Sequence, residues 1–363
     1  MQTYGRPPFL KFISLFLLLS FSFTACQKPV TEKPKEKFFI RSADLSKLPE
    51  LTEEGAIFRD ASGQRKEALQ IFRSAGLNII RVRLWVNPSG THSSLKEVTV
   101  FSQKIQAMGL KVWLDLHYSD TWADPGKQTM PKAWKNLSFT QLKDTVYTYT
   151  LRVVRQIHPQ YVQIGNEINN GFLWDDGNIN HPQQFIALLQ KGIAAVRRAD
   201  THIRILLHYA GYYGAETFFS LLQKYHIDYD LIGLSYYPWW HGKSLDVLQQ
   251  TILRLETTHL KPVVIAETAY PFTLSWNDNT NNFVGNRQQL IQEYPATAEG
   301  QKAFLSALRK IISETPYGGG LCYWEPEWIT IKRAHNTTGS PWENLALFDF
   351  QNRALPAMAV FQP

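Results

Sequence analysis

The 363-residue chain has few charged residues and almost no cysteine. Only 19% of its residues are Asp, Glu, Lys or Arg, and they form no basic block that could follow a phosphate backbone. The formal net charge of +7 therefore does not indicate nucleic-acid binding. Two cysteines, Cys26 and Cys322, exclude a disulfide framework. Because 44% of the residues are hydrophobic, a disordered chain is also excluded, and the sequence predicts a folded globular protein.

The N-terminus has the pattern of an export signal. Two basic residues precede the apolar run of residues 12–25, which is too short for a comfortable permanent membrane span. The four residues that end at Cys26 resemble a bacterial lipobox, although Phe23 stands where leucine is usual. We therefore expect residues 1–25 to be a lipoprotein signal peptide and Cys26 to be lipidated. An ordinary signal peptide that happens to contain a cysteine is the alternative.

Residues 26–37 are polar, contain proline and have few apolar side chains, which predicts a flexible tether. A lipid on Cys26 would hold the protein at a membrane, so the predicted location is that of an exported bacterial lipoprotein at the outer membrane or cell surface. Cys322 would then have no partner and is expected to be a buried thiol. Residues 38–363 are expected to form one folded domain, with a monomer as the default state.

Within that domain, short apolar runs alternate with longer amphipathic ones such as Arg65–Ala75 and Thr140–His158. This alternation is typical of βα units around a parallel sheet. The eight expected strands are Phe38–Leu45, Asn78–Val86, Leu110–His117, Gln160–Glu167, Ile203–Ala210, Leu231–Tyr237, Pro262–Thr268 and Gly319–Glu325. We predict an α/β fold, a single (β/α)₈ TIM barrel. A doubly wound open sheet is the alternative, but no glycine-rich phosphate loop follows the first strand.

Seven of the eight expected strands acquire polar or aromatic residues at their C-terminal ends, where barrel active sites lie. Glu167 closes the fourth strand and Glu267 the seventh. Two facing carboxylates fit glycoside hydrolysis, in which one protonates the leaving oxygen while the other attacks the anomeric carbon. A metal-dependent hydrolase built on His117 and His208 is an alternative, but the sequence has no HxH or HExxH spacing.

Aromatic residues are abundant, with 11 Trp, 16 Tyr and 21 Phe. Trp rings stack on the weakly apolar faces of sugars, which gives this surplus a use. Six of them lie at or just beyond strand ends and could form a sugar platform: Trp85, Trp122, Trp174, Trp239, Trp240 and Trp324. Trp113 instead alternates into a strand and is expected in the core.

Several longer stretches resemble glycoside hydrolase family 53, the endo-β-1,4-galactanases. They are residues 76–88, 114–128, 162–174, 233–240, 265–273 and 323–325, so the resemblance extends over essentially the whole folded part. The run HYSDTWADPGKQ is long and unusual enough to point to the family and not only to its fold. The resemblance implies a retaining endo-glycosidase that needs no cofactor and cuts β-1,4-galactan, the galactose side chains of pectin.

The resemblance also implies roles for individual residues. Glu167 matches the general acid/base and Glu267 the nucleophile, and Asn166 would bind the sugar 2-hydroxyl. The other residues to which the resemblance gives a place in the substrate site are Arg81, His117, His208, Tyr237 and Trp324. Position alone predicts that Trp122 and the residues Asp120, Asp124, Lys127 and Gln128, which follow the third strand, also line the cleft.

Two of these roles have a neighbouring candidate. Arg81 is expected to keep the nucleophile ionised, a task that Arg83 on the same face of the strand could share. Tyr237, or its neighbour Tyr236, is expected to orient the nucleophile.

Some family members hold a structural calcium in the loop after the seventh strand. Here that loop, residues 276–282, has Asp278 as its one carboxylate among asparagines. Such a run is also typical of plain turns, so both interpretations stay open.

Two functional alternatives remain at the level of the sequence. A related barrel glycosidase could act on mannan or a β-glucan, because the catalytic pair does not distinguish these polymers. A surface glycan-binding protein would keep the aromatic cleft without chemistry, but it would have no need of Glu267.

Overall fold

The computed structural model describes residues 1–5, 39–333 and 337–363. Most of the predicted signal peptide, the lipidation site Cys26 and the predicted tether lie outside these residues, so those assignments stay predictions. The barrel and everything packed on it belong to one unit, Lys37–Pro363. Within the described ranges, no helix combines the length and the apolar character that a membrane crossing requires.

Eight parallel strands close into a barrel, which confirms the predicted fold. Their order around the barrel is β1-β10-β9-β8-β7-β6-β5-β4, and β4 pairs back with β1. The strands are β1 (Ile40–Asp44), β4 (Ile79–Leu84), β5 (Lys111–Leu116), β6 (Tyr161–Ile164), β7 (Arg204–Ala210), β8 (Leu231–Ser235), β9 (Val263–Glu267) and β10 (Gly320–Trp324). Each of them overlaps one of the eight strands expected from the sequence.

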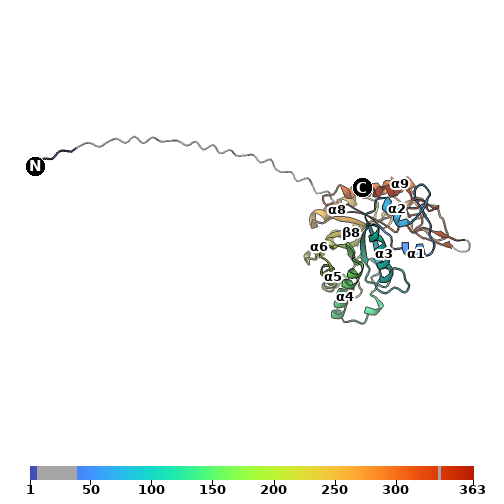
Figure 1. The fold of residues 1–363 in the computed structure, drawn as a ribbon, viewed down its shortest axis with the longest axis horizontal. Coiled ribbons are helices and arrows are strands. Elements are labelled where there is room, and N and C mark those ends of the chain that lie inside the picture. The colour runs from blue at the N-terminus through green and yellow to red at the C-terminus, as the bar shows by residue number, and fades with distance from the viewer. Residues whose placement is uncertain (6–38, 334–336) are drawn as a thin grey trace. The chain divides into compact units, whose positions relative to one another are not determined.

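Helices follow the strands and surround the barrel (Figure 1). The longer ones are α2 (Ala68–Ser74), α3 (Leu95–Ala107), α4 (Phe139–Ile157), α5 (Pro182–Ala199), α6 (Ala215–Lys224), α8 (Leu245–His259) and α9 (Ala298–Ser313). Short helices α1 (Leu48–Glu53) and α7 (Pro238–His241) lie in the loops after β1 and β8. Several N-termini are encoded locally, because Ser94, Ser138, Ser244 and Thr297 each accept a backbone N–H of the first turn.

One predicted helix begins later than the sequence suggested. Arg65 and Lys66 form the short strand β3, which pairs with β2 (Phe58–Arg59). The Asp60 carboxylate accepts backbone N–H groups within the intervening turn, and this local bonding competes with a helix. A second hairpin, β11 (Ile331–Lys332) with β12 (Thr337–Thr338), lies near the C-terminal end of the chain.

The barrel interior has an apolar layer and a polar layer. The apolar layer consists of Ile40, Ile79, Trp113, Tyr161, Leu206, Leu231, Val264, Ala266 and Cys322. Two residues further along four of these strands come Arg81, Asp115, Gln163 and His208, all buried. Because alternate residues of a strand face the same side, these polar groups lie above the apolar layer on the same interior face. The predicted burial of Trp113 and of the free thiol of Cys322 is confirmed.

Candidate active site

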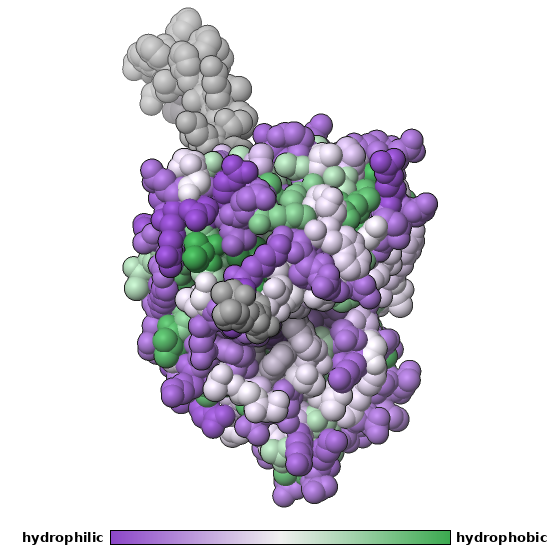
Figure 2. All heavy atoms as spheres, turned by 90° about the vertical axis from the view of Figure 1, so that its right-hand side faces the viewer, coloured by the Kyte–Doolittle hydropathy of each residue, from purple (hydrophilic) through white to green (hydrophobic). Residues whose placement is uncertain are grey.

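A cleft of about 710 Å³ lies at the C-terminal ends of the barrel strands. Its aromatic wall consists of Trp122, Tyr237, Trp240, Phe283, Trp324, Trp328 and Trp342, and its polar lining includes Asp44, Arg81, Asp115, Asn166, Glu167 and Glu267. In Figure 2, hydrophobic residues form only small separate groups on the face drawn, and pale residues of intermediate hydropathy surround a central hollow. A mostly aromatic cleft with a few convergent polar groups is typical of a ligand site.

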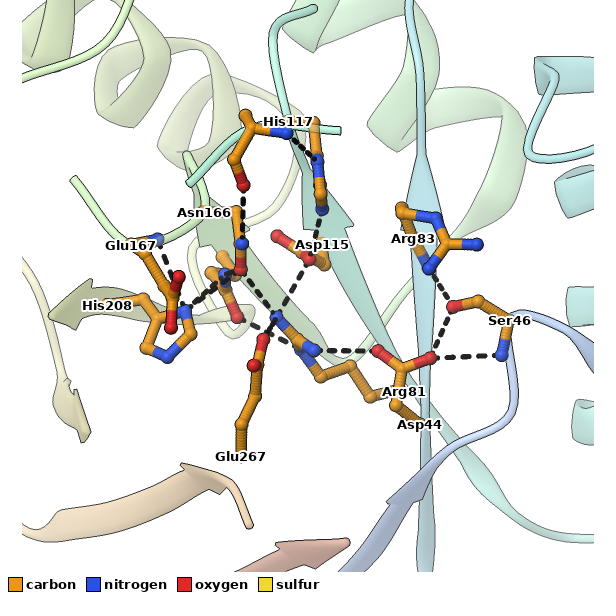
Figure 3. A network of polar contacts seen from close by, with 12 residues as sticks. Asp44, Ser46, Arg81, Arg83, Asp115, His117, Asn166, Glu167, His208 and Glu267 are labelled. Carbon is orange, nitrogen blue, oxygen red and sulfur yellow. Dashed lines mark hydrogen bonds and ion pairs between the residues drawn. The ribbon is translucent and has the colours of Figure 1, made fainter. Parts of the chain in front are cut away.

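Arg81 lies at the centre of the polar layer (Figure 3). Its guanidinium contacts the carboxylates of Asp44 at 2.7 Å, Asp115 at 2.8 Å and Glu267 at 2.9 Å. It also donates to the Asn166 amide oxygen at 2.8 Å. Burial lowers the pKa of Arg81, but the three carboxylates raise it more, so the pKa stays well above its ordinary value. The buried charge is therefore permanent and paired, as a charge in this environment must be.

Glu267 ends β9 and has two donors. Arg81 binds Oε1, and the Tyr237 hydroxyl, just after β8, donates to Oε2 at 3.1 Å. Burial raises the pKa of Glu267, Arg81 opposes that rise, and nearby Glu167 adds to it. The expected contacts of Arg81 and Tyr237 with this carboxylate are both present.

Glu167 lies three residues after the last residue of β6, Ile164, and has a left-handed backbone (φ 47°). The Ser235 hydroxyl donates to its Oε1 at 2.5 Å. Burial raises the pKa of Glu167 to about 7. An oxygen of Glu167 and an oxygen of Glu267 lie within 4.8 Å of each other. That spacing matches retaining glycosidases, whose carboxyl groups are about 5–5.5 Å apart, and not inverting ones, where a water must fit between them.

Two carboxyls this close do not ionise independently. Within the described residues, the Glu267 carboxylate accepts hydrogen bonds from the Arg81 guanidinium and the Tyr237 hydroxyl, whereas the Glu167 carboxyl accepts one, from the Ser235 hydroxyl. Donors to the charged form favour ionisation, so Glu267 loses its proton first and Glu167 retains one at neutral pH. The pair thus offers one carboxylate, on Glu267, and one protonated carboxyl, on Glu167.

The two predicted histidines have both ring nitrogens occupied by protein groups. In His117, Nδ1 accepts the Ala123 N–H at 3.1 Å, so Nε2 carries the proton and donates to Asp115 at 3.0 Å. His208 is fully buried, with Nδ1 at 3.4 Å from the Glu167 backbone N–H and Nε2 at 2.9 Å from the Ser235 hydroxyl. His117 lines the cleft, but His208 lies beneath its wall.

Within the described residues, the acidic and histidine side chains with the spacing of a metal site are Glu167, His208 and Glu267. They do not fit a metal centre well, because His208 bonds to protein groups through both nitrogens and Glu267 already pairs with Arg81. The arrangement instead fits acid–base and nucleophilic chemistry.

Several other expected residues also reach the cleft. Asn166 donates one N–H to the Ala123 carbonyl at 2.9 Å, which leaves its second N–H for a ligand. Trp122 and Trp324 have ring centres 5.9 Å apart. Trp240 also lines the cleft, whereas Trp85, Trp174 and Trp239 lie outside the lining.

The structure does not bring Asp120 into the cleft. Its carboxylate accepts the backbone N–H groups of Asn87 at 3.0 Å and Lys132 at 2.8 Å, and so ties two loops together. Its neighbours Asp124 and Lys127 are the loop residues that line the cleft.

Two neighbouring candidates also have different partners from those expected. Arg83 pairs with Glu325 at 2.8 Å and stacks 3.8 Å from the Trp122 ring, so it supports the platform and not the nucleophile. The Tyr236 hydroxyl donates to the Gly242 carbonyl.

Three further residues that line the cleft were not predicted from the sequence: Asp44, Trp328 and Trp342. Asp44 ends β1, so the strand-end pattern used for the other seven strands would have found it. Trp328 and Trp342 come from the segment after β10, where no strand end marks them. Trp342 packs edge-on against Trp324, with ring centres 4.7 Å apart.

A (β/α)₈ barrel with two carboxylates at retaining distance under an aromatic cleft defines a retaining glycosidase. The chain belongs to glycosyl hydrolase family 53, which it matches over residues 40–361. It is similar to an arabinogalactan endo-β-1,4-galactanase of Cellvibrio japonicus, with 38% identity over 89% of this chain and 90% of that one. It is also similar to an endo-β-1,4-galactanase of Bacillus subtilis, with 32% identity over 90% and 86% of the two chains. The solved family 53 catalytic domain of Ignisphaera aggregans superposes with a TM-score of 0.84 at 38% identity, over 89% of this chain and 95% of that domain.

The raised pKa of Glu167 predicts a pH-dependent stability cost. Between pH 4.5 and about 7 the folded state binds more protons at this group than the unfolded state does, so the free energy of unfolding falls as pH rises. Glu167→Gln removes that cost, and its Tm should exceed that of the unmodified protein by more at pH 8 than at pH 5. Thermal melts at both pH values measure this, with exposed Glu53→Gln as the control. An equal Tm difference at both pH values would contradict the assignment.

Proposed function

We propose that this glycosidase hydrolyses β-1,4-galactan at interior bonds with retention of configuration. The observation that carries the proposal is the Glu167–Glu267 pair on the floor of an aromatic cleft. The substrate is supported by the named activity of the relatives from Cellvibrio japonicus and Bacillus subtilis, which align over nine-tenths of this chain. No cofactor is needed, because the two glutamates supply both the acid and the nucleophile.

The reaction proceeds in two displacements. Glu267 attacks the anomeric carbon while Glu167 gives its proton to the leaving glycosidic oxygen, and a covalent glycosyl-enzyme forms. Glu167, now a carboxylate, then takes a proton from water, which attacks the same carbon and releases Glu267. The free N–H of Asn166 lies in the cleft wall, where it can bind the sugar 2-hydroxyl in the charged transition state.

We also propose that the protein is exported and anchored through a lipid on Cys26, at the outer membrane or cell surface, and that it is a monomer. The lipobox-like residues 23–26 and the polar segment after them support the anchor. Sedimentation velocity of the detergent-solubilised protein would test the monomer.

We further propose that the loop around Asp278 holds its shape without calcium. The Asp278 carboxylate accepts the backbone N–H groups of Thr280 at 2.5 Å and Ser340 at 2.9 Å. The Thr330 hydroxyl contacts both Asp278 and Glu343. The Thr330 hydroxyl has a single proton and so can donate to only one of the two carboxyls, and a proton on the other would complete the arrangement. Burial raises the pKa of Glu343, which favours that carboxyl as the one that carries the proton.

The substrate is tested by a reducing-end assay of the purified protein on β-1,4-galactan, mannan and a β-glucan. We expect mixed short galactooligosaccharides to appear early, from galactan alone. Activity confined to mannan or β-glucan would discard the substrate while leaving the two-glutamate mechanism intact. Galactan binding without turnover would favour the non-catalytic alternative.

The roles of the two glutamates are tested by azide rescue of alanine variants on an activated aryl β-galactoside. In Glu167→Ala, azide takes the place of water at the glycosyl-enzyme, so the product should be the β-galactosyl azide. In Glu267→Ala, azide replaces the nucleophile in a single inverting displacement, so the product should be the α-anomer. NMR of the products identifies the anomer that each variant forms. An α-azide from Glu167→Ala and a β-azide from Glu267→Ala would require the two roles to be exchanged.

The anchor is tested by metabolic labelling with palmitate. Cys26→Ser should abolish labelling and release the protein into the soluble fraction, because the acylated thiol is gone. Cys322→Ser is the matched control, since Cys322 is buried and should not affect labelling. A Cys26→Ser protein that still incorporates palmitate would contradict the lipobox assignment.

The calcium proposal is tested by thermal melts after dialysis against a chelator and after addition of Ca²⁺. Because protein donors surround Asp278, the Tm should agree in the two conditions. A substantially higher Tm with calcium would show that an ion, and not a proton, completes the loop.

A further inference from the structure

A chain of hydrogen bonds runs from Arg81 to the carboxyl group of Glu167. Arg81 donates through Nε to the side-chain amide oxygen Oε1 of Gln163 at 3.2 Å. This bond fixes the orientation of the side-chain amide, so that Nε2 of Gln163 is a donor. Gln163 Nε2 lies 3.0 Å from Nδ1 of His208. His208 Nε2 lies 2.9 Å from the Ser235 hydroxyl, and Ser235 lies 2.5 Å from Glu167 Oε1. His208 and Ser235 are fully buried, so water does not compete for these contacts.

The proton position on His208 follows from its neighbours. The backbone N–H of Glu167 points at His208 Nδ1, 3.4 Å away, and has no other hydrogen-bond partner within the described residues. A backbone N–H can only donate, so Nδ1 accepts. Gln163 Nε2 can only donate and also faces Nδ1, at 3.0 Å, although its two protons are shared among Nδ1, the Gly165 carbonyl oxygen at 3.1 Å and the Asn166 amide oxygen at 3.1 Å. Nδ1 also lies 3.0 Å from the Asn166 amide oxygen, which accepts from Arg81. A neutral imidazole that accepts at Nδ1 carries its proton on Nε2.

The direction of the remaining bonds is then determined. His208 Nε2 donates to the Ser235 oxygen, so the single proton of Ser235 goes to Glu167 Oε1. An oxygen that accepts this bond is not the one that carries the acid proton. Oε2 of Glu167 has no partner among the described residues, and the side chain lines the cleft.

We propose that Ser235 is a positioning residue for the acid/base glutamate. Its hydroxyl donates a hydrogen bond to Oε1 of Glu167, so the exchangeable proton of Glu167 is confined to Oε2, the oxygen available to substrate. The inference rests on the proposed catalytic role of Glu167. The same bond stabilises the carboxylate once the proton has left for the glycosidic oxygen, so Ser235 supports Glu167 in both steps of the reaction.

Besides the Ser235 hydroxyl, which donates to it directly, several charged groups face the Glu167 carboxyl. Arg81 from β4 lowers the pKa of Glu167, while Asp115 from β5 and Asp124 from the following loop raise it. The remaining titratable groups around Glu167 and His208 are His117, Tyr237, His241 and Glu267.

The first test is the pH profile of galactan hydrolysis by Ser235→Ala. Removing the donor destabilises the Glu167 carboxylate, so the alkaline limb of kcat/KM should move up by about one pH unit, with kcat at the optimum about tenfold lower. Ser102→Ala is the matched control, because Ser102 is equally buried in α3 and its hydroxyl has no partner within residues 39–333. An alkaline limb that stays in place, with kcat lowered equally at all pH values, would overturn the proposal.

The second test uses the unmodified protein and does not depend on turnover or on the folding of a variant. In ¹⁵N-histidine-labelled protein, the His208 ring signals, assigned with His208→Gln, should show the proton on Nε2. A proton on Nδ1 would reverse the chain and overturn the proposal. Failure of the galactan assay itself would instead contradict the proposed substrate, so the two failures are distinguishable.

Discussion

The active site depends on one buried guanidinium facing more negative charge than it can neutralise. Arg81 contacts Asp44, Asp115 and Glu267, each within 3 Å, and Glu167 adds a fourth carboxyl nearby. Burial disfavours the charged form of the Glu167 carboxyl, and the neighbouring Asp115 and Asp124 raise its pKa further, so a proton is retained. The proton remains where donors are fewest, on Glu167. Arg81 therefore stabilises the Glu267 carboxylate, whereas burial keeps the proton on Glu167 near neutral pH.

The barrel makes this arrangement possible because its interior is layered. Side chains of alternate residues point inward, so the apolar layer around Trp113 lies directly beneath the polar layer that contains Arg81. The apolar layer excludes water from below, which strengthens every charge interaction above it. Parallel strands bring Asp44, Asp115 and Glu267 to one level from distant parts of the chain, and no local segment could hold all three.

The aromatic wall is supported by a second, separate ion pair. Arg83 binds Glu325 and stacks on Trp122, so the charged residue two positions after Arg81 on β4 supports the aromatic wall instead of contacting Glu267. Trp324 and Trp342 pack against each other on the adjacent part of the wall. The two arginines of β4 therefore have separate structural roles: Arg81 pairs with Glu267, and Arg83 supports the aromatic wall.

The sequence by itself determined the barrel, its eight strands and the two glutamates that we propose as catalytic, because these depend on local periodicity and on residues placed at strand ends. It also indicated Arg81, Asn166 and Tyr237 through the family resemblance. Only the tertiary structure decided which arginine reaches Glu267, that Asp120 ties two loops together, and that His208 bonds to Ser235 instead of lining the cleft. Those outcomes depend on distances between strands and loops far apart in the chain. Trp328 and Trp342 enter the site for the same reason, since an irregular segment has no periodicity from which the direction of its side chains can be predicted.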